Sequence, residues 1–325
     1  MKKPVIDLHC DLLYYLLNPN SNLHDRDLGC AIPYLLEGNV KLQIMAIFAL
    51  TTKGSHHLGI KQAELFYGLN INNSQLNSIK NRIIPEVDEI ERIGMLASIE
   101  NASAFCDEDL SLKEGLQNLE EIKGLVGNIT YIGLTHHAEN RFGGGNYTSI
   151  GLKEDGKTLI DYLDNKKIAI DLSHTSDALA YDIINYISKQ NFDIPIIASH
   201  SNYRHVFDHP RNLPDELAQE IIDQKGLIGL NFLRAFVNNS NPNALFDHLE
   251  HAINIGAQDN ICFGADYFYH KDHPDKSRIP FFYKEHENAS CYPHVLEVID
   301  SKFGSQITDK IANKNVIRFL HNLWE

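Results

Sequence analysis

Short apolar runs rich in Val, Ile and Leu recur along the chain and alternate with stretches of helical periodicity. Eight runs predict strands: Val5–His9, Leu42–Leu50, Met95–Glu100, Ile129–His136, Ile168–His174, Ile194–His200, Leu227–Phe232 and Ile261–Asp266. Several are continuously apolar rather than alternating, which is typical of parallel strands covered on both faces.

Helical patterns fill most of the intervals between these runs. Predicted helices cover Gly156–Lys167, Ala178–Ile187, residues 212–226, Ala244–Ile255, Pro293–Phe303 and residues 308–324, with a longer, less regular one within Thr51–Arg82. The repeated strand–helix alternation predicts an α/β fold, a (β/α)8 TIM barrel that occupies residues 1–325 as a single domain. A doubly wound open sheet is the alternative, but neither a dinucleotide-binding nor a P-loop glycine motif is present.

Chemically active side chains gather where the predicted strands end. They are His9 and Asp11, Glu100, His136, His174, His200 and Asp266. In a parallel barrel the carboxyl ends of all strands open onto one mouth, so these distant residues are expected to converge there. His9 and Asp11, two residues apart on an extended chain, are expected to share a face.

The donor set indicates a metal site rather than a polar core. Imidazole and carboxylate together suit divalent metals, and the set exceeds what one catalytic zinc needs with a position left open. A carboxylate between two cations can bridge them, and a water held there is a nucleophile near neutral pH. The residues therefore predict two metal ions, and zinc, manganese and cobalt all suit these donors.

The charge and composition of the chain exclude some classes of binding partner. Acidic residues number 43 against 29 basic ones, a net charge of −14, which argues against nucleic acid or an anionic membrane surface as a partner. We expect no membrane anchor, because no apolar run is long enough to span a bilayer. The five scattered cysteines form no C-x-x-C pair and predict free thiols in a reducing compartment, the cytoplasm.

Seven short motifs occur in an order that resembles the membrane (renal) dipeptidase family, peptidase family M19, a branch of the amidohydrolase-like TIM-barrel metallohydrolases. They are DLHCD, SIEN, GLTHH, DLSH, ASHSNYR, HPRNLPDE and FGAD, and they span residues 5 to about 266. The resemblance implies a binuclear zinc dipeptidase that hydrolyses the amide bond of small dipeptides by means of a metal-bridging hydroxide. Relatives also imply a homodimer.

The same resemblance implies a role for each site residue. His9 and Asp11 would bind one zinc, His174 and His200 the other, and Glu100 would bridge both. His136 would stabilise the oxyanion, and Arg211 would bind the carboxylate of the substrate. Asp266 would bind its amino group and shuttle a proton. His137 is predicted to be structural, because alternation lets only one of the two adjacent histidines face the mouth.

Two departures from the family pattern leave the substrate open. Leu233 stands where the family often has a tyrosine, and DYFYHKD replaces D-F-D-G after the eighth strand. The alternatives are another amide or lactone substrate on the same metal centre, such as an N-acyl amino acid or an L,D-dipeptide, or an inactive metal-binding homologue. The segment HKDHPDK at residues 270–276 is predicted to be an exposed lid loop.

Overall fold

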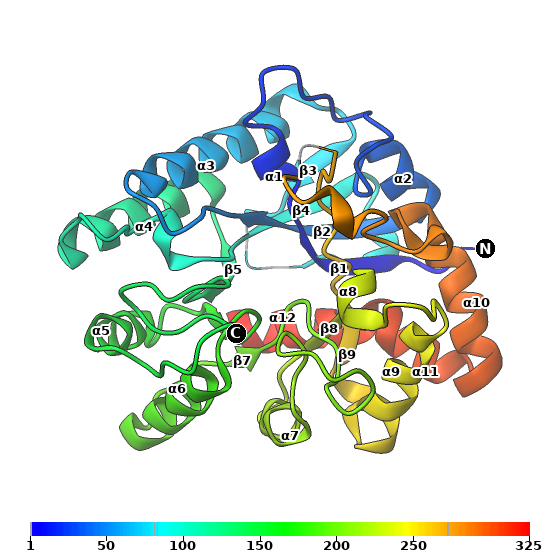
Figure 1. Cartoon of the computed structure of the whole chain (residues 1–325). Helices are drawn as coiled ribbons and strands as arrows, with labels where there is room; N and C mark the ends of the chain where they lie inside the picture. The colour runs from blue at the N-terminus through cyan, green and yellow to red at the C-terminus, as the bar shows by residue number, and fades with distance from the viewer. Residues whose placement is uncertain (1, 81, 83, 272) are drawn as a thin grey trace.

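Parallel strands form a nearly closed barrel surrounded by helices in the computed structural model, which describes residues 2–80, 82, 84–271 and 273–325 (Figure 1). The barrel strands are β1 (Val5–Cys10), β2 (Val40–Ile47), β4 (Ile93–Ile99), β5 (Ile129–Gly133), β6 (Ala169–Asp171), β7 (Ile196–Ile197), β8 (Ile228–Leu230) and β9 (Ile261–Phe263). They follow the order β7-β6-β5-β4-β2-β1-β9-β8. A parallel bridge between Ala198 and Ile228 joins the two ends. The predicted TIM-barrel fold is confirmed.

The α-helices follow the strands around the outside of the barrel. They are α1 (Leu12–Tyr15), α2 (Ile32–Glu37), α3 (Ser55–Asn72), α4 (Leu112–Val126), α5 (Glu154–Leu163), α6 (Asp177–Gln190), α7 (Asp215–Asp223), α8 (Arg234–Val237), α9 (Ala244–Asn254), α10 (Tyr292–Phe303), α11 (Ser305–Asp309) and α12 (Asn315–Trp324). Helix α4 is absent from the sequence prediction, although Ser111 and Glu114 form a capping box at its start.

Two long predicted helices are divided in the structure. The segment Thr51–Arg82 contains α3 and then a short strand, β3 (Leu76–Ser78), which pairs with the start of β4; its residue 81 lies outside the described residues. The predicted helix at 308–324 is a succession of α11, a π-helical turn at Lys310–Lys314 and α12.

Helix α12 closes the barrel interior on the side away from the carboxyl-terminal ends of the strands. Its Val316, Phe319, Leu320 and Leu323 belong to one buried cluster with inward-facing barrel residues that include Ile6, Leu8, Leu42, Ile44 and Tyr131. Burial of each large apolar side chain contributes on the order of 1.5–3 kcal/mol to folding. The described interior is therefore a packed core, which leaves the carboxyl-terminal mouth of the barrel for the predicted site residues.

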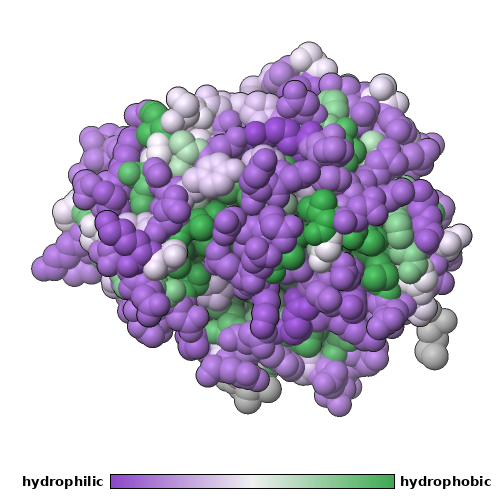
Figure 2. Space-filling view, turned by 90° about the horizontal axis from the view of Figure 1, so that it is seen from below, coloured by the Kyte–Doolittle hydropathy of each residue, from purple (hydrophilic) through white to green (hydrophobic). Residues whose placement is uncertain are grey.

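The face seen in Figure 2 is mostly hydrophilic, with hydrophobic residues in separate patches. None of the helices in the described residues is both long and apolar enough to cross a membrane. All five cysteines are free, and all but Cys291 are buried, in agreement with the prediction of free thiols.

The hydrogen-bonded strands end earlier than the predicted apolar runs. The ladders stop at Gly133, Asp171, Ile197 and Phe263 rather than at the chemically active residues that follow. Consequently His136, His174, His200 and Asp266 lie on the loops that leave the strands. These loops provide the freedom to turn the side chains toward the barrel axis.

Gly133 is required where β5 ends beside the segment that carries Glu100. A Cβ atom at residue 133 would lie 2.3 Å from the backbone oxygen of Glu100. Gly133→Ala should therefore lower the free energy of unfolding by about 1–3 kcal/mol, measured by chemical denaturation, and weaken zinc uptake. Gly124→Ala is the control: this site in α4 has open space, so the added methyl should stabilise the helix by about 0.5–1 kcal/mol. Equal stability of the Gly133→Ala and parent proteins would contradict the argument.

Candidate metal centre

An irregularity in β1 turns His9 into the barrel mouth. The register of β1 against β2 shifts between Asp7 and Cys10, and the His9 amide donates to Asp7 Oδ1 at 2.9 Å. Asp7 itself accepts a hydrogen bond from Tyr292 of α10, while His9 contacts Tyr131 of the barrel interior. Simple alternation would place residues 7 and 9 on one face. The bulge separates them, as such features commonly do beside active sites.

The chain leaves its strand by a left-handed turn at two other site residues. His174 follows β6 with φ of 67°, and Asp266 follows β9 with φ of 65°. The left-handed region costs a non-glycine residue on the order of 1 kcal/mol, and such strain is concentrated at functional sites. The Asp266 amide donates to the His9 backbone oxygen at 3.2 Å, so the ends of β9 and β1 are held together.

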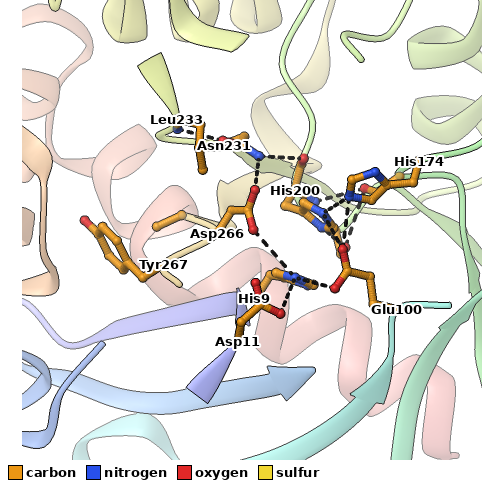
Figure 3. Close-up of polar contacts among 12 residues, drawn as sticks. His9, Asp11, Glu100, His174, His200, Asn231, Leu233, Asp266 and Tyr267 are labelled. Atoms are coloured by element: carbon orange, nitrogen blue, oxygen red, sulfur yellow. Dashed lines mark hydrogen bonds and ion pairs between the residues drawn. The ribbon is translucent and has the colours of Figure 1, made fainter. Parts of the chain in front are cut away.

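The two carboxylate oxygens of Glu100 face different imidazoles, His9 on one side and His174 and His200 on the other (Figure 3). Its Oε2 is 3.7 Å from His9 Nε2. Its Oε1 is 3.0 Å from His174 Nε2 and 3.8 Å from His200 Nε2. Asp11 Oδ1 lies 3.9 Å from His9 Nε2 on the first side.

Two candidate ligand groups therefore share Glu100. One is His9, Asp11 and Glu100, and the other is Glu100, His174 and His200. Within each group the potential ligand atoms lie within 4.8 Å of one another. The structure brings together the five residues that the sequence singled out as metal ligands.

Outer hydrogen bonds orient the imidazoles. Tyr131 Oη lies 2.9 Å from His9 Nδ1. Ser199 Oγ lies 2.6 Å from His200 Nδ1 and donates to the buried carboxylate of Asp171 at 2.5 Å. These contacts occupy the Nδ1 atoms and leave both Nε2 atoms facing Glu100. Such partners fix the ring orientation and tautomer of metal-binding histidines.

A further set of polar partners was missed from the sequence. Asn146 Oδ1 lies 3.3 Å from His174 Nδ1 and 3.0 Å from His137 Nδ1. Asn231 Nδ2 donates to Asp266 Oδ2 at 2.8 Å. Both asparagines lie on loops without a distinctive local pattern. Ser199 was also missed, although its position immediately before a strand-end histidine is a usable signal.

The electrostatics of the mouth show an excess of negative charge. Burial lowers the pKa of His9, but the carboxylates of Glu100, Asp11 and Asp266 outweigh burial and raise it to about 10. Burial and the neighbouring Glu100 carboxylate raise the pKa of Asp11 well above its usual range. Burial raises the pKa of Glu100, but the nearby His9 cation outweighs it and lowers this pKa to about 2. The protein alone thus holds its carboxylates beside one protonated imidazole.

Divalent cations would satisfy atoms that the protein leaves without partners. Among the described residues, His9 Nε2 and Asp11 Oδ1 are buried and accept or donate no hydrogen bond. Burial lowers the pKa values of His174 and His200 well below the usual range, so both rings are neutral and free to act as ligands. The residues present fit divalent metal, and nitrogen and oxygen donors of this kind accept zinc, manganese or cobalt.

The mouth opens into a cavity of about 520 Å³. Its floor includes Asp11, Glu100, His136, His174 and Asp266, and its walls include Tyr14, Phe48, Leu50, Leu233, Phe236, Phe268, His273 and Arg278. These last two residues lie in or beside the predicted lid segment 270–276; its residue 272 lies outside the described residues.

His136 and His137 both line this cavity. The prediction that only one of them faces the mouth is wrong, because β5 ends at Gly133 and alternation no longer applies. His136 Nε2 lies 3.7 Å from Glu100 Oε1. Burial and the neighbouring His137 lower the pKa of His136 to about 3, so its ring is neutral.

Arg211 lies behind His200 rather than on the cavity wall. Its side chain is only 3% exposed, and it donates from Nη1 to Ser201 Oγ and from Nη2 to the His200 backbone oxygen. Its Nε has no partner among the described residues. The guanidinium stays close to the site, since its charge contributes to lowering the pKa values of His174 and His200, after burial.

A comparison with protein families and curated proteins identifies relatives of the chain. The family model described as membrane dipeptidase, peptidase family M19, matches residues 1–323. An uncharacterized protein of the pqqA 5′ region of Klebsiella pneumoniae is 26% identical over 249 residues, which cover 72% of this chain and 83% of that protein. An uncharacterized dipeptidase of Schizosaccharomyces pombe is 27% identical over 66% of this chain. The match covers 53% of the yeast protein, about half its length.

Solved structures show the same fold. Dipeptidase AC, a metallopeptidase of family M19, has a TM-score of 0.83 and 21% identity, covering 100% of this chain and 99% of its own. A metallopeptidase of Rhodobacter sphaeroides, crystallised with a phosphinate mimic of the dipeptide L-Ala-D-Ala, has a TM-score of 0.81 and 20% identity, with full coverage of both chains. At these identities the likeness establishes the barrel architecture.

Zinc affinity should rise with pH. Without metal, the surrounding carboxylates raise the pKa of His9 to about 10, so its proton must leave before Nε2 binds a cation. After chelation, calorimetric zinc titration should show roughly tenfold weaker binding for each pH unit lowered between about pH 8.5 and 6.5. The control His24→Ala removes an exposed imidazole outside the site and should leave this dependence unchanged. A zinc affinity independent of pH would contradict the argument that His9 is protonated before the metal binds.

Proposed function

The chain belongs to the membrane dipeptidase family, peptidase family M19, and we propose that it is a binuclear zinc dipeptidase that hydrolyses the single amide bond of small dipeptides. The observation that carries the proposal is the position of Glu100, which has one carboxylate oxygen beside His9 and the other beside His174 and His200. The ligand named for the Rhodobacter sphaeroides protein, a dipeptide mimic, supports the substrate class.

We assign the five ligands to two zinc ions. His9 and Asp11 would hold one ion, His174 and His200 would hold the other, and Glu100 would be shared by both. When bound, the cations would polarise the scissile carbonyl and lower the pKa of the attacking water. Manganese or cobalt would serve the same donors.

Asp266 is proposed to bind the amino group of the substrate and to carry a proton to the leaving amine. Its Oδ2 accepts a hydrogen bond from Asn231, while its Oδ1 lies 3.8 Å from His9 Nε2, so the carboxylate is held between cavity and ligands. Burial, with a further contribution from Glu100, raises its pKa to about 6. Acid–base groups work best with a pKa near the operating pH, which favours this role.

His136 and Arg211 complete the proposed set of residues that act on the substrate. The neutral His136 ring lines the cavity beside Glu100 and would donate a hydrogen bond to the oxyanion. Arg211 retains an Nε–H without a partner and would attract the carboxylate of the substrate. The homodimer and the cytoplasmic location stay predictions.

The function is tested by assaying the zinc-loaded protein against a dipeptide panel with both L and D carboxyl-terminal residues. Turnover that requires metal supports the proposal. A protein that binds zinc at both groups yet cleaves no dipeptide would be an inactive homologue or would act on another amide or lactone, and the proposal would be wrong.

Asp266→Asn should lower kcat by about 10²–10⁴-fold, the usual contribution of a positioned acid–base group. Its metal content, measured by elemental analysis, should match that of the parent protein because Asp266 is not among the five assigned ligands. Unchanged turnover would remove the proton-shuttle role.

Arg211→Ala should raise KM for dipeptides with a free carboxylate by roughly 10-fold, because the nearby positive charge that would attract this carboxylate is lost. The same dipeptides with an amidated carboxyl end are the comparison, and they should lose little. Similar losses on both series would show that Arg211 supports the fold of the site rather than the substrate carboxylate.

A further inference from the structure

Arg278 places a second guanidinium at the cavity. It ends the 3-10 turn at Lys276–Arg278, in the loop between β9 and α10, and it is half-buried where it lines the cavity wall. Its guanidinium carbon lies 5.2 Å from the ring centroid of Phe281, which restricts the orientation of the side chain. Among the described residues no carboxylate lies within 4.0 Å of it.

The charges of the two guanidinium groups reach the same pair of histidines, His137 and His209. After burial, the charges of Arg211 and Arg278 both contribute to lowering the pKa values of His137 and His209. His209 accepts a hydrogen bond from the Arg211 amide, and the Tyr147 ring contacts both the His209 ring and the ring of His137, which lines the cavity together with Arg278. Arg278 therefore faces the end of the cavity that the proposed function gives to the carboxyl-terminal residue of the substrate.

The other residues that line the cavity favour binding of an anionic side chain beside Arg278 rather than elsewhere in the cavity. The cavity floor carries the carboxylates of Asp11, Glu100 and Asp266, whereas much of the wall is apolar. An anionic side chain directed at the floor would be repelled, and one left on the apolar wall would lose its hydration. Beside Arg278 it would gain charge-assisted hydrogen bonds from a planar donor that matches a carboxylate.

We propose that the preferred substrates carry aspartate or glutamate as the carboxyl-terminal residue, with the side-chain carboxylate bound by Arg278 and the α-carboxylate attracted by Arg211. This inference rests on the proposed dipeptidase function. It makes Arg278 the residue that determines specificity, on a loop whose sequence departs from the family pattern.

The test compares alanyl-glutamate, its neutral isostere alanyl-glutamine, and alanyl-alanine, each with an L or D carboxyl-terminal residue, on the zinc-loaded full chain. The parent protein should cleave alanyl-glutamate of one configuration with a kcat/KM about 10- to 100-fold above that of alanyl-glutamine. Arg278→Gln should abolish most of this ratio by lowering the alanyl-glutamate value. Lys276→Gln is the matched control, since it removes an exposed positive charge two residues away that does not line the cavity.

The outcomes separate this inference from the proposed function. Cleavage of all three dipeptides without preference for glutamate would leave the dipeptidase assignment intact and overturn the acidic specificity. Equal losses on all three substrates in Arg278→Gln would also overturn it, because the guanidinium would then serve the α-carboxylate. An equal loss of preference in Lys276→Gln would overturn it as well, because the preference would then come from long-range charge rather than from contact with Arg278. A parent protein that cleaves no dipeptide would overturn the proposed function, and this inference with it.

Discussion

The carboxylate of Glu100 is the point on which the mouth of the barrel depends. Its two oxygens face imidazoles that come from opposite parts of the sheet, His9 from β1 on one side and His174 and His200 after β6 and β7 on the other. Without cations, the carboxylates of Asp11, Glu100 and Asp266 raise the pKa of His9 to about 10 against the effect of burial, whereas burial keeps the rings of His174 and His200 neutral. Two divalent ions would offset the charge of these carboxylates, because each would take nitrogen donors on one side and share the carboxylate of Glu100 between them.

In this fold, the side chains that stabilise the barrel lie apart from the side chains that form the site. The interior below the mouth is filled by apolar side chains and closed by α12. The fold can therefore tolerate local backbone strain at the strand ends. His174 and Asp266 adopt left-handed conformations there, and β1 contains a bulge. Each irregularity turns a side chain toward the axis, where regular alternation would not have placed it.

The sequence predicted the barrel and the convergence of the site residues because both follow from repeated local patterns. Apolar runs mark buried strands, and a parallel barrel brings their ends together whatever the details of each loop. The orientation of His137 and the partners Asn146 and Asn231 depend on loops that meet only after folding, so no periodicity reports them. Arg278 lies two residues beyond the segment 270–276 that composition marked as an exposed loop. Its place on the cavity wall follows from how that loop packs against Phe281.

The central claim is that Glu100 joins two metal ions, and anomalous diffraction from zinc-soaked crystals tests it most directly. The account predicts two anomalous peaks about 3.5–4 Å apart, with one oxygen of Glu100 bound to each. A single peak, or two peaks of which only one contacts Glu100, would contradict it.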